Sequence, residues 1–185
     1  MKVCKFGGTS LASAEQIKKV FNIVTSDPER RIVVVSAPGK EHDADTKVTD
    51  MLIKMAESHI KTGDCEEELN AIVGRFARIA EGLELGDEIV RDIENNLRTR
   101  ISLGYDSKEK FIDRIKAAGE DNCARLVARY FNSRGVYAQY INPKDAGLYL
   151  SDEYGNARVL PQSFKNLAKL KNLDGILIFP GFFGY

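Results

Sequence analysis

The stretch KFGGTS at residues 5–10 combines residue types that can hold a phosphate group. An apolar strand pattern ends at Phe6, two glycines and two hydroxyl residues follow, and a helical pattern begins near Ala14. Glycines let the backbone approach a ligand closely, and free backbone N–H groups before a helix attract anions. Lys5 adds a positive charge suited to stabilising a transferred phosphoryl group. By spacing alone, an ordinary turn with a surface lysine is an equally good interpretation.

The composition of the 185 residues excludes several kinds of partner. Apolar residues make up 43% and charged residues 29%, which is typical of a globular domain. Lysine plus arginine equals aspartate plus glutamate at 27 each, so we expect no nucleic-acid or membrane partner. The three cysteines lie far apart without a C-x-x-C pair, which predicts no metal site and no disulfide framework. Because no signal peptide or membrane span is evident, we expect a cytoplasmic protein.

The pattern of apolar residues predicts an α/β fold. Strand patterns occur at residues 2–6, 30–37, 135–141 and 174–180. The second run is continuously apolar at its centre, as expected for a strand that is buried on both faces of a parallel sheet. Since helical patterns separate these runs, we predict a three-layer αβα sandwich with a mostly parallel sheet.

Apolar residues spaced three and four apart predict the helices. The expected helices start near residue 14 and then cover about 48–62, 69–79, 89–101 and 108–133. Ser13 and Gln16 resemble a capping box at the first of these helices, and Gly63 lies just past the end of the second. Gly119 interrupts the last helical pattern, so we expect that helix to split or bend there.

The densest loop signal lies at residues 36–50 and directly follows the buried strand pattern. Proline, glycine and many charged residues mark this segment as a loop. In open α/β sheets, ligands bind beyond the carboxyl ends of the strands, so this loop is a second candidate for a functional segment.

The sequence contains five motifs that together are far more specific than a single pair of glycines. They are KFGGTS, VVVSAPGK with TKVTD, AAGEDNCARL, SDEYGNA and PGFFG. In this order they resemble the signatures of aspartate kinases, within the amino-acid kinase superfamily, and they span essentially the whole chain. The resemblance implies the amino-acid kinase fold. It also implies transfer of the γ-phosphoryl group of ATP, with Mg²⁺, to the β-carboxylate of L-aspartate, the first step of lysine, threonine and methionine biosynthesis.

The resemblance assigns the phosphate-facing roles to the first motif. Lys5 would be the catalytic residue that stabilises charge during phosphoryl transfer. Gly7, Gly8, Thr9 and Ser10 would cradle the γ-phosphate. From the residue types alone, the two hydroxyls could equally make local turn or cap hydrogen bonds.

The resemblance assigns the aspartate-binding roles to residues farther along the chain. Ser36 and Thr49 match positions that hold the substrate, Glu120 matches the glutamate that pairs with its α-amino group, and Phe182 matches an aromatic whose backbone lies near it. Taken alone, Thr49 and Glu120 read as helix-end residues and Phe182 as a core or interface side chain. Ala117 departs from the family pattern, which has a serine there.

The pair Ser151 and Asp152 matches a threonine–aspartate pair of the family, but the resemblance assigns it no role. Its place in the SDEYGNA motif marks it as part of a loop.

The resemblance also implies that residues 1–185 are the N-terminal portion of a catalytic domain. In complete aspartate kinases, an arginine segment with a G-G-S-D run, the nucleotide-binding half and regulatory ACT domains follow the last motif. We therefore expect this chain to carry the aspartate-binding side and to be inactive alone. The resemblance further implies a homo-oligomer for the complete enzyme, and an exposed strand edge in this chain predicts self-association.

Two other functions remain open. One is a superfamily member that acts on glutamate, acetylglutamate, carbamate or UMP, although the T-S ending of the first motif and the GED segment favour aspartate. The other is a non-catalytic half-kinase module that binds an amino acid or a partner protein without turnover. A structural α/β domain without a ligand is a third alternative, and the ordered set of motifs makes it the weakest.

Overall fold

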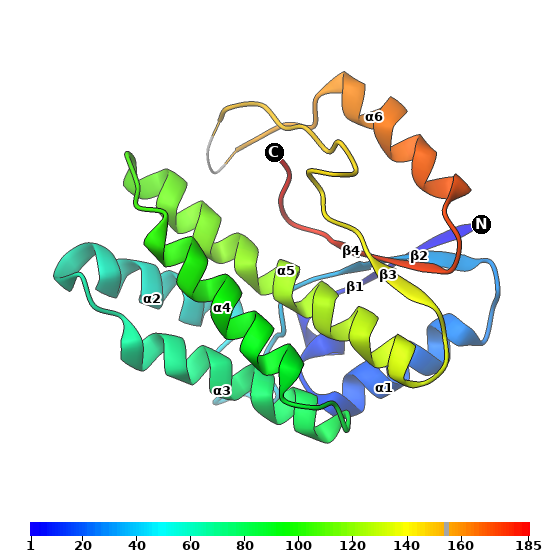
Figure 1. Ribbon diagram of the computed structural model, residues 1–185, viewed down its shortest axis with the longest axis horizontal. Coiled ribbons are helices and arrows are strands. Elements are labelled where there is room, and N and C mark those ends of the chain that lie inside the picture. Colours follow the sequence, from blue (N-terminus) through cyan, green and yellow to red (C-terminus); the bar gives the residue numbers. More distant parts are fainter. Residues whose placement is uncertain (154–155) are drawn as a thin grey trace.

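A computed structural model of the chain describes residues 1–153 and 156–185 (Figure 1). Residues 154 and 155 of the SDEYGNA motif lie outside the described residues. Across the described ranges, none of the helices is long and apolar enough to cross a membrane.

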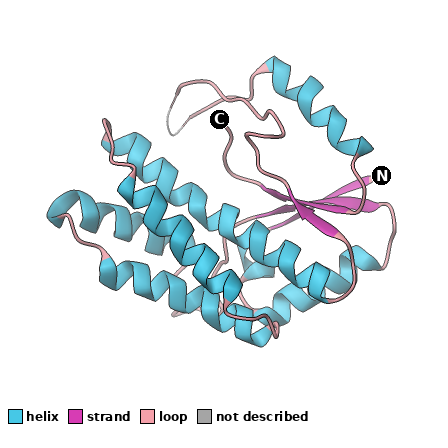
Figure 2. Cartoon of the chain, viewed as in Figure 1, coloured by secondary structure: helices cyan, strands magenta, loops and turns pink. Residues whose placement is uncertain are grey.

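The strands form one parallel sheet (Figure 2). They are β1 (Lys2–Phe6), β2 (Arg30–Val35), β3 (Ala138–Tyr140) and β4 (Ile176–Pro180), in the spatial order β1-β2-β4-β3. Phe6 lies opposite Val35, which in turn lies opposite Pro180. The register therefore brings the carboxyl ends of three strands to one edge of the sheet, and the loops after them meet there.

Helices cover both faces of the sheet, as the three-layer prediction requires. One layer contains α1 (Ala14–Thr25), α2 (Val48–Thr62), α3 (Glu66–Gly82), α4 (Glu88–Ser102) and α5 (Lys108–Ser133). The short helix α6 (Pro161–Leu167) and the 3₁₀ helix η2 (Ala168–Asn172) lie on the other side (Figure 1). The α/β class with a parallel sheet is confirmed.

The two faces differ in the size of their cores. The larger core joins buried side chains of α1 to α5 with Val33 and Val35 of β2. The smaller one contains Ile141, Leu170, Leu177 and Phe179. Because β2 and β4 pack between the two cores, side chains on both faces hold the edge of the sheet where the strands end.

Two helix ends form as the sequence predicts. The Ser13 hydroxyl accepts a hydrogen bond from the Gln16 backbone N–H at 3.4 Å, which caps α1. Gly63 ends α2 with a φ of 76°, a left-handed conformation that glycine adopts without a Cβ clash.

The predicted break at Gly119 is wrong, because α5 is one continuous helix of 26 residues. A Cβ built on Gly119 would lie 2.8 Å from the Ala37 Cβ and 3.0 Å from Leu52 Cδ1. Gly119 therefore permits close packing of α5 against the loop after β2 and against α2. Burial along α5 outweighs the low helix propensity of one glycine.

Candidate functional site

The candidate site lies at the carboxyl ends of β1, β2 and β4. After β1, the chain forms the 3₁₀ helix η1 (Gly8–Leu11), so Thr9 and Ser10 sit on a short helical turn. Gly39, in the loop after β2, donates a backbone hydrogen bond to the Gly8 carbonyl at 2.8 Å. Gly181, directly after β4, donates one to the Val35 carbonyl at 2.9 Å. These bonds join three separate segments into one surface.

Glycine is required at two positions of this surface because the backbones nearly touch. A Cβ on Gly39 would lie 2.6 Å from the Gly8 carbonyl carbon, and a Cβ on Gly8 would lie 3.0 Å from the Ala37 oxygen. In contrast, a Cβ on Gly7 would meet nothing within 4 Å. Packing thus explains Gly8 and Gly39, whereas Gly7 borders free space that a ligand can use.

Glu120 is the buried acid of the site. Its residue is 6% exposed on α5, and its Oε2 has no hydrogen-bond partner among the described residues. Burial raises the pKa of this carboxyl, and the backbone of Ala37 and the positive charges of Lys116 and Lys5 only partly offset that effect. The structure therefore brings Lys5, near the end of β1, and Glu120 into one electrostatic environment, although they are 115 positions apart in the sequence. An external cation would satisfy the free carboxylate oxygen.

The neighbouring acid, Asp121, is buried as well but has several partners. Arg100 Nη2 lies 3.0 Å and Arg125 Nε 3.4 Å from Asp121 Oδ2, and the Tyr140 hydroxyl donates to Oδ1. Asp121 therefore joins α4, α5 and β3 and is structurally satisfied. Both residues are buried acids, so it is the position of Glu120 in the fold that leaves its Oε2 without a partner among the described residues.

The four hydroxyl residues of the prediction lie on the loops of this edge. Thr9 is exposed, while Ser10, Ser36 and Thr49 are half-buried. Within the described part of the chain, none of their hydroxyl groups makes a hydrogen bond. The alternative of local turn or cap bonding for Thr9 and Ser10 is thus not realised, and all four hydroxyls remain available to a ligand.

Phe182 follows β4 and is 56% exposed, so it is not a core residue. The Lys116 ammonium lies 5.2 Å from the centre of its ring, which is a cation–π distance. Because Lys116 precedes Glu120 by about one turn of α5, Phe182 lies over the same part of that helix.

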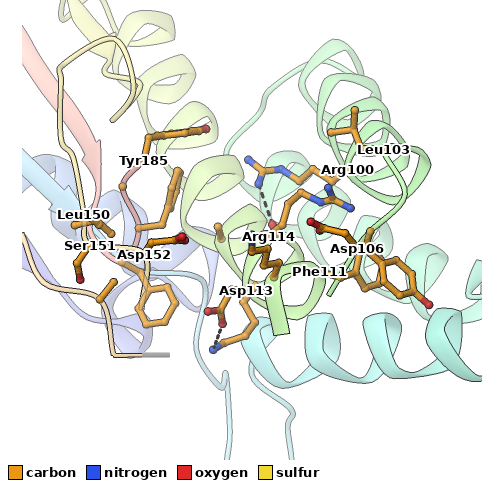
Figure 3. Close-up of a pocket in the computed structure, with 18 of the residues that line it drawn as sticks. Arg100, Leu103, Asp106, Phe111, Asp113, Arg114, Leu150, Ser151, Asp152 and Tyr185 are labelled. Atoms are coloured by element: carbon orange, nitrogen blue, oxygen red, sulfur yellow. Dashed lines mark hydrogen bonds and ion pairs between the residues drawn. The ribbon is translucent and has the colours of Figure 1, made fainter. Parts of the chain in front are cut away.

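A cleft of about 1300 Å³ opens beside these residues (Figure 3). Arg100 and Arg114 of α4 and α5 lie on one side, and Asp152 and Tyr185 lie on the other. Of the predicted site residues, only Phe182 lines this cleft. The other predicted residues lie on the loops at the strand ends and on α5, and do not line the cleft.

Ser151, which borders the cleft, has local partners. Its backbone N–H donates to the Arg158 carbonyl at 2.8 Å, and its hydroxyl accepts from the Arg158 backbone N–H at 2.9 Å. These bonds shape the loop on which Asp152 lies and account for Ser151 without a ligand.

Sequence reasoning missed Arg75 of α3, which is only 2% exposed. It hydrogen-bonds to Gly39 O and Ala12 O and forms an ion pair with Asp45. A signal was present, because Arg75 occupies the helix face that also contains Ile72 and Ile79, where the spacing calls for an apolar residue.

Comparisons with known proteins agree with this geometry. The amino acid kinase family model matches residues 1–185. Aspartokinase 3 of Bacillus subtilis is 54% identical over 185 residues, and Aspartokinase 2, chloroplastic, of Arabidopsis thaliana is 32% identical over 177 residues. A crystal structure of Escherichia coli aspartokinase III in complex with aspartate and ADP superposes with a TM-score of 0.80 at 27% identity and covers 98% of this chain.

The chain therefore belongs to the amino acid kinase family. Within that family it is an aspartokinase homologue, and it spans only part of those enzymes. It covers 41% of the B. subtilis relative, 31% of the Arabidopsis relative and 40% of the E. coli structure.

Proposed function

We propose that residues 1–185 form the N-terminal portion of an aspartate kinase catalytic domain and provide its aspartate-binding side. The observation that carries the proposal is the buried Glu120 carboxylate, whose Oε2 lacks a partner within the described residues and which lies near Lys5. The E. coli relative that binds aspartate and ADP supports this interpretation.

In the proposed complex, the Glu120 carboxylate accepts hydrogen bonds from the α-ammonium group of aspartate. This pairing supplies the positive charge that the buried carboxylate lacks. The hydroxyls of Ser36 and Thr49 donate to the substrate, and the backbone around Phe182 closes the same side. An amino acid with a shorter or longer side chain would hold its carboxylate at a different distance from the phosphate-facing residues.

The proposed reaction forms a bond between a β-carboxylate oxygen of aspartate and the γ-phosphorus of ATP. The bond from that phosphorus to the bridging oxygen breaks, and ADP leaves. Because the attacking carboxylate is already ionised at neutral pH, no general base is required. The task of the site is to align the two groups and to neutralise charge, with Lys5 and the N–H groups of residues 7–9 facing the phosphoryl oxygens.

We propose that Mg²⁺ arrives with the nucleotide. Across the described residues, no group of three or more His, Cys, Asp or Glu side chains is placed to hold a metal ion. Mg²⁺ would offset the negative charge of the phosphates when bound. We further propose a cytoplasmic location and a homo-oligomeric full-length enzyme, as the resemblance to aspartate kinases implies.

Calorimetric titration of this chain with L-aspartate and L-glutamate tests the proposed site. We expect aspartate to bind more tightly, and Glu120→Gln to weaken its binding about tenfold or more, because a charge-assisted hydrogen bond contributes about 1.5–3 kcal/mol. Glu109→Gln is the matched control, since Glu109 lies exposed on the same helix. Tighter binding of glutamate, or equal effects of the two substitutions, would contradict the proposal.

Phosphoryl transfer is tested separately by trapping aspartyl phosphate as its hydroxamate. We expect product from the full-length gene product with ATP and Mg²⁺, and none from residues 1–185 alone. Product formed by the 185-residue chain would show that the proposed division of labour is wrong.

A further inference from the structure

Arg75 connects segments that lie far apart in the sequence. Its Nη2 group donates to the Gly39 carbonyl at 2.9 Å and to the Ala12 carbonyl at 3.2 Å. Its Nη1 group lies 2.6 Å from Asp45, and its Nε group 3.4 Å from Glu41. One buried side chain of α3 thus holds the start and the end of the loop at residues 36–47, and also the backbone that follows η1.

The chemistry of this position requires arginine. A planar guanidinium presents several N–H donors in a fixed fork, whereas a lysine ammonium is a single point of charge. Two carbonyl groups and two carboxylates surround Arg75, so its buried charge is compensated from several directions. Burial works against ionisation of Asp45, but backbone N–H groups and the Arg75 guanidinium hold its pKa at about 2.

The segments that Arg75 holds are those that carry the candidate site. The loop at residues 36–47 starts with Ser36 and ends where α2 begins, and Thr49 lies in the first turn of that helix. The Val48 N–H donates to the Pro38 carbonyl at 3.1 Å, which fixes the start of α2 against the loop. Gly39, which Arg75 contacts from one side, donates to Gly8 on the other. A single arginine therefore fixes the loop after β2 against the loop after β1.

We propose that Arg75 is a positioning residue that holds the loop at residues 36–47 against the loop after β1 (residues 7–12) and so orders the proposed aspartate and phosphate sites together. The catalytic part of this inference rests on the function proposed above. Without Arg75, the loop would have to be ordered by the substrate, so apparent affinity would fall by the fraction of molecules in the competent state. Once substrate is bound, the geometry of transfer is restored.

Hydrogen exchange of this chain by NMR tests the holding role without any activity. In Arg75→Met we expect the Gly39 amide to exchange about tenfold or more faster relative to the β2 amides, because the loop opens locally. Arg78→Met is the matched control, since Arg78 lies exposed on the same helix and, among the residues that the structure describes, bonds to Gly74 of that helix alone. Asp45→Asn should give a smaller increase and serves if Arg75→Met does not fold. A change common to Gly39 and β2 amides, or equal exchange in the two arginine variants, would overturn the inference.

Kinetics of the full-length gene product test the catalytic consequence. We expect Arg75→Met to raise KM for aspartate about tenfold with kcat within about threefold of the parent, and Arg75→Lys to recover part of the loss. If Arg75→Met only destabilises the enzyme, the active fraction and therefore kcat fall while KM stays the same. That result would overturn the positioning role. If the parent itself makes no aspartyl phosphate, the proposed function fails, and the exchange experiment alone decides whether Arg75 holds the loop.

Discussion

Two neighbouring regions, the loops at the strand ends and the segments that line the cleft, are built in different ways. The glycine wall, residues 5–10 with 36–39, consists of backbone segments in direct contact, supported by the buried Arg75. The C-terminal wall, residues 150–152 with 181–185, presents exposed side chains such as Phe182 and Tyr185 to the cleft. The glycine wall is therefore preorganised within this chain.

The largest expected effect of a single methyl group is on the glycine wall. In Gly39→Ala, the new Cβ would lie 2.6–2.9 Å from three backbone atoms of Gly8 and Thr9. Since backbone cannot swing aside as a side chain can, we expect a loss of about 3 kcal/mol of unfolding free energy. Urea unfolding monitored by circular dichroism measures it.

Gly7→Ala is the control for that substitution, because its Cβ meets nothing within 4 Å and its φ of −78° suits any residue. We expect its stability to stay within about 1 kcal/mol of the parent. If both variants unfold at the same urea concentration, the glycine wall is not closely packed in solution.

For two other glycines, each within a helix, substitution by alanine should change the unfolding free energy in opposite directions. Gly119→Ala in α5 should lower the unfolding free energy by about 1–2 kcal/mol, because its Cβ would lie 2.8 Å from the Ala37 Cβ. Gly74→Ala in α3 should raise it by up to about 1 kcal/mol, because its Cβ has free space and alanine favours a helix. Thermal unfolding of both variants checks the signs, and stabilisation by both would contradict the packing of α5 on the glycine wall.

The same residues show what the sequence can and cannot predict. Periodicity predicts the strands and the long helices because apolar spacing depends on each segment alone. It fails at Gly119, where the reason for glycine lies in Ala37 and Leu52, which are distant in sequence. The seven residues of α6 are too short for their spacing to stand out, and only Pro161 at its first turn marks a helix start.

The candidate site divides in a similar way. Motif resemblance brings Lys5 and Glu120 to attention, but the unpartnered Oε2 and the closeness of the two charges require the fold. Arg75 belongs to no motif, and its partners come from two other segments, the loop at residues 36–47 and the backbone after η1. Residues that support a site through tertiary contacts leave only an out-of-pattern charge in the sequence.

Two carboxyl groups of the site region should respond to pH in opposite directions. Burial raises the pKa of Glu120 above its ordinary value of 4.5, so the folded chain binds more protons than the unfolded chain in the pH range between that value and the folded pKa. Its ionisation therefore costs stability as the pH rises through its folded pKa. For Asp45, whose pKa is about 2, the contribution to stability is present above pH 3.8 and is lost as the pH falls toward 2.

Unfolding free energies measured from pH 3 to pH 8 separate the two. We expect Glu120→Gln to be more stable than the parent near neutral pH, with the difference shrinking toward pH 4. We expect Asp45→Asn to be less stable than the parent at neutral pH, with the difference shrinking toward pH 3. Parallel profiles for the parent and both variants would mean that neither carboxyl has the environment described.

The smallest effect is expected on the C-terminal wall. Phe182→Ala should change the unfolding free energy by less than about 0.5 kcal/mol, because the ring is 56% exposed and packs beside the Lys116 ammonium. Phe179→Ala, three residues earlier, should cost about 3–5 kcal/mol because that ring is 8% exposed in the smaller core. A comparable loss in both variants, measured by urea unfolding at low protein concentration, would mean that the C-terminal wall is as closed as the glycine wall. If the loss from Phe182→Ala appears only at high protein concentration, a second copy of the chain covers that ring.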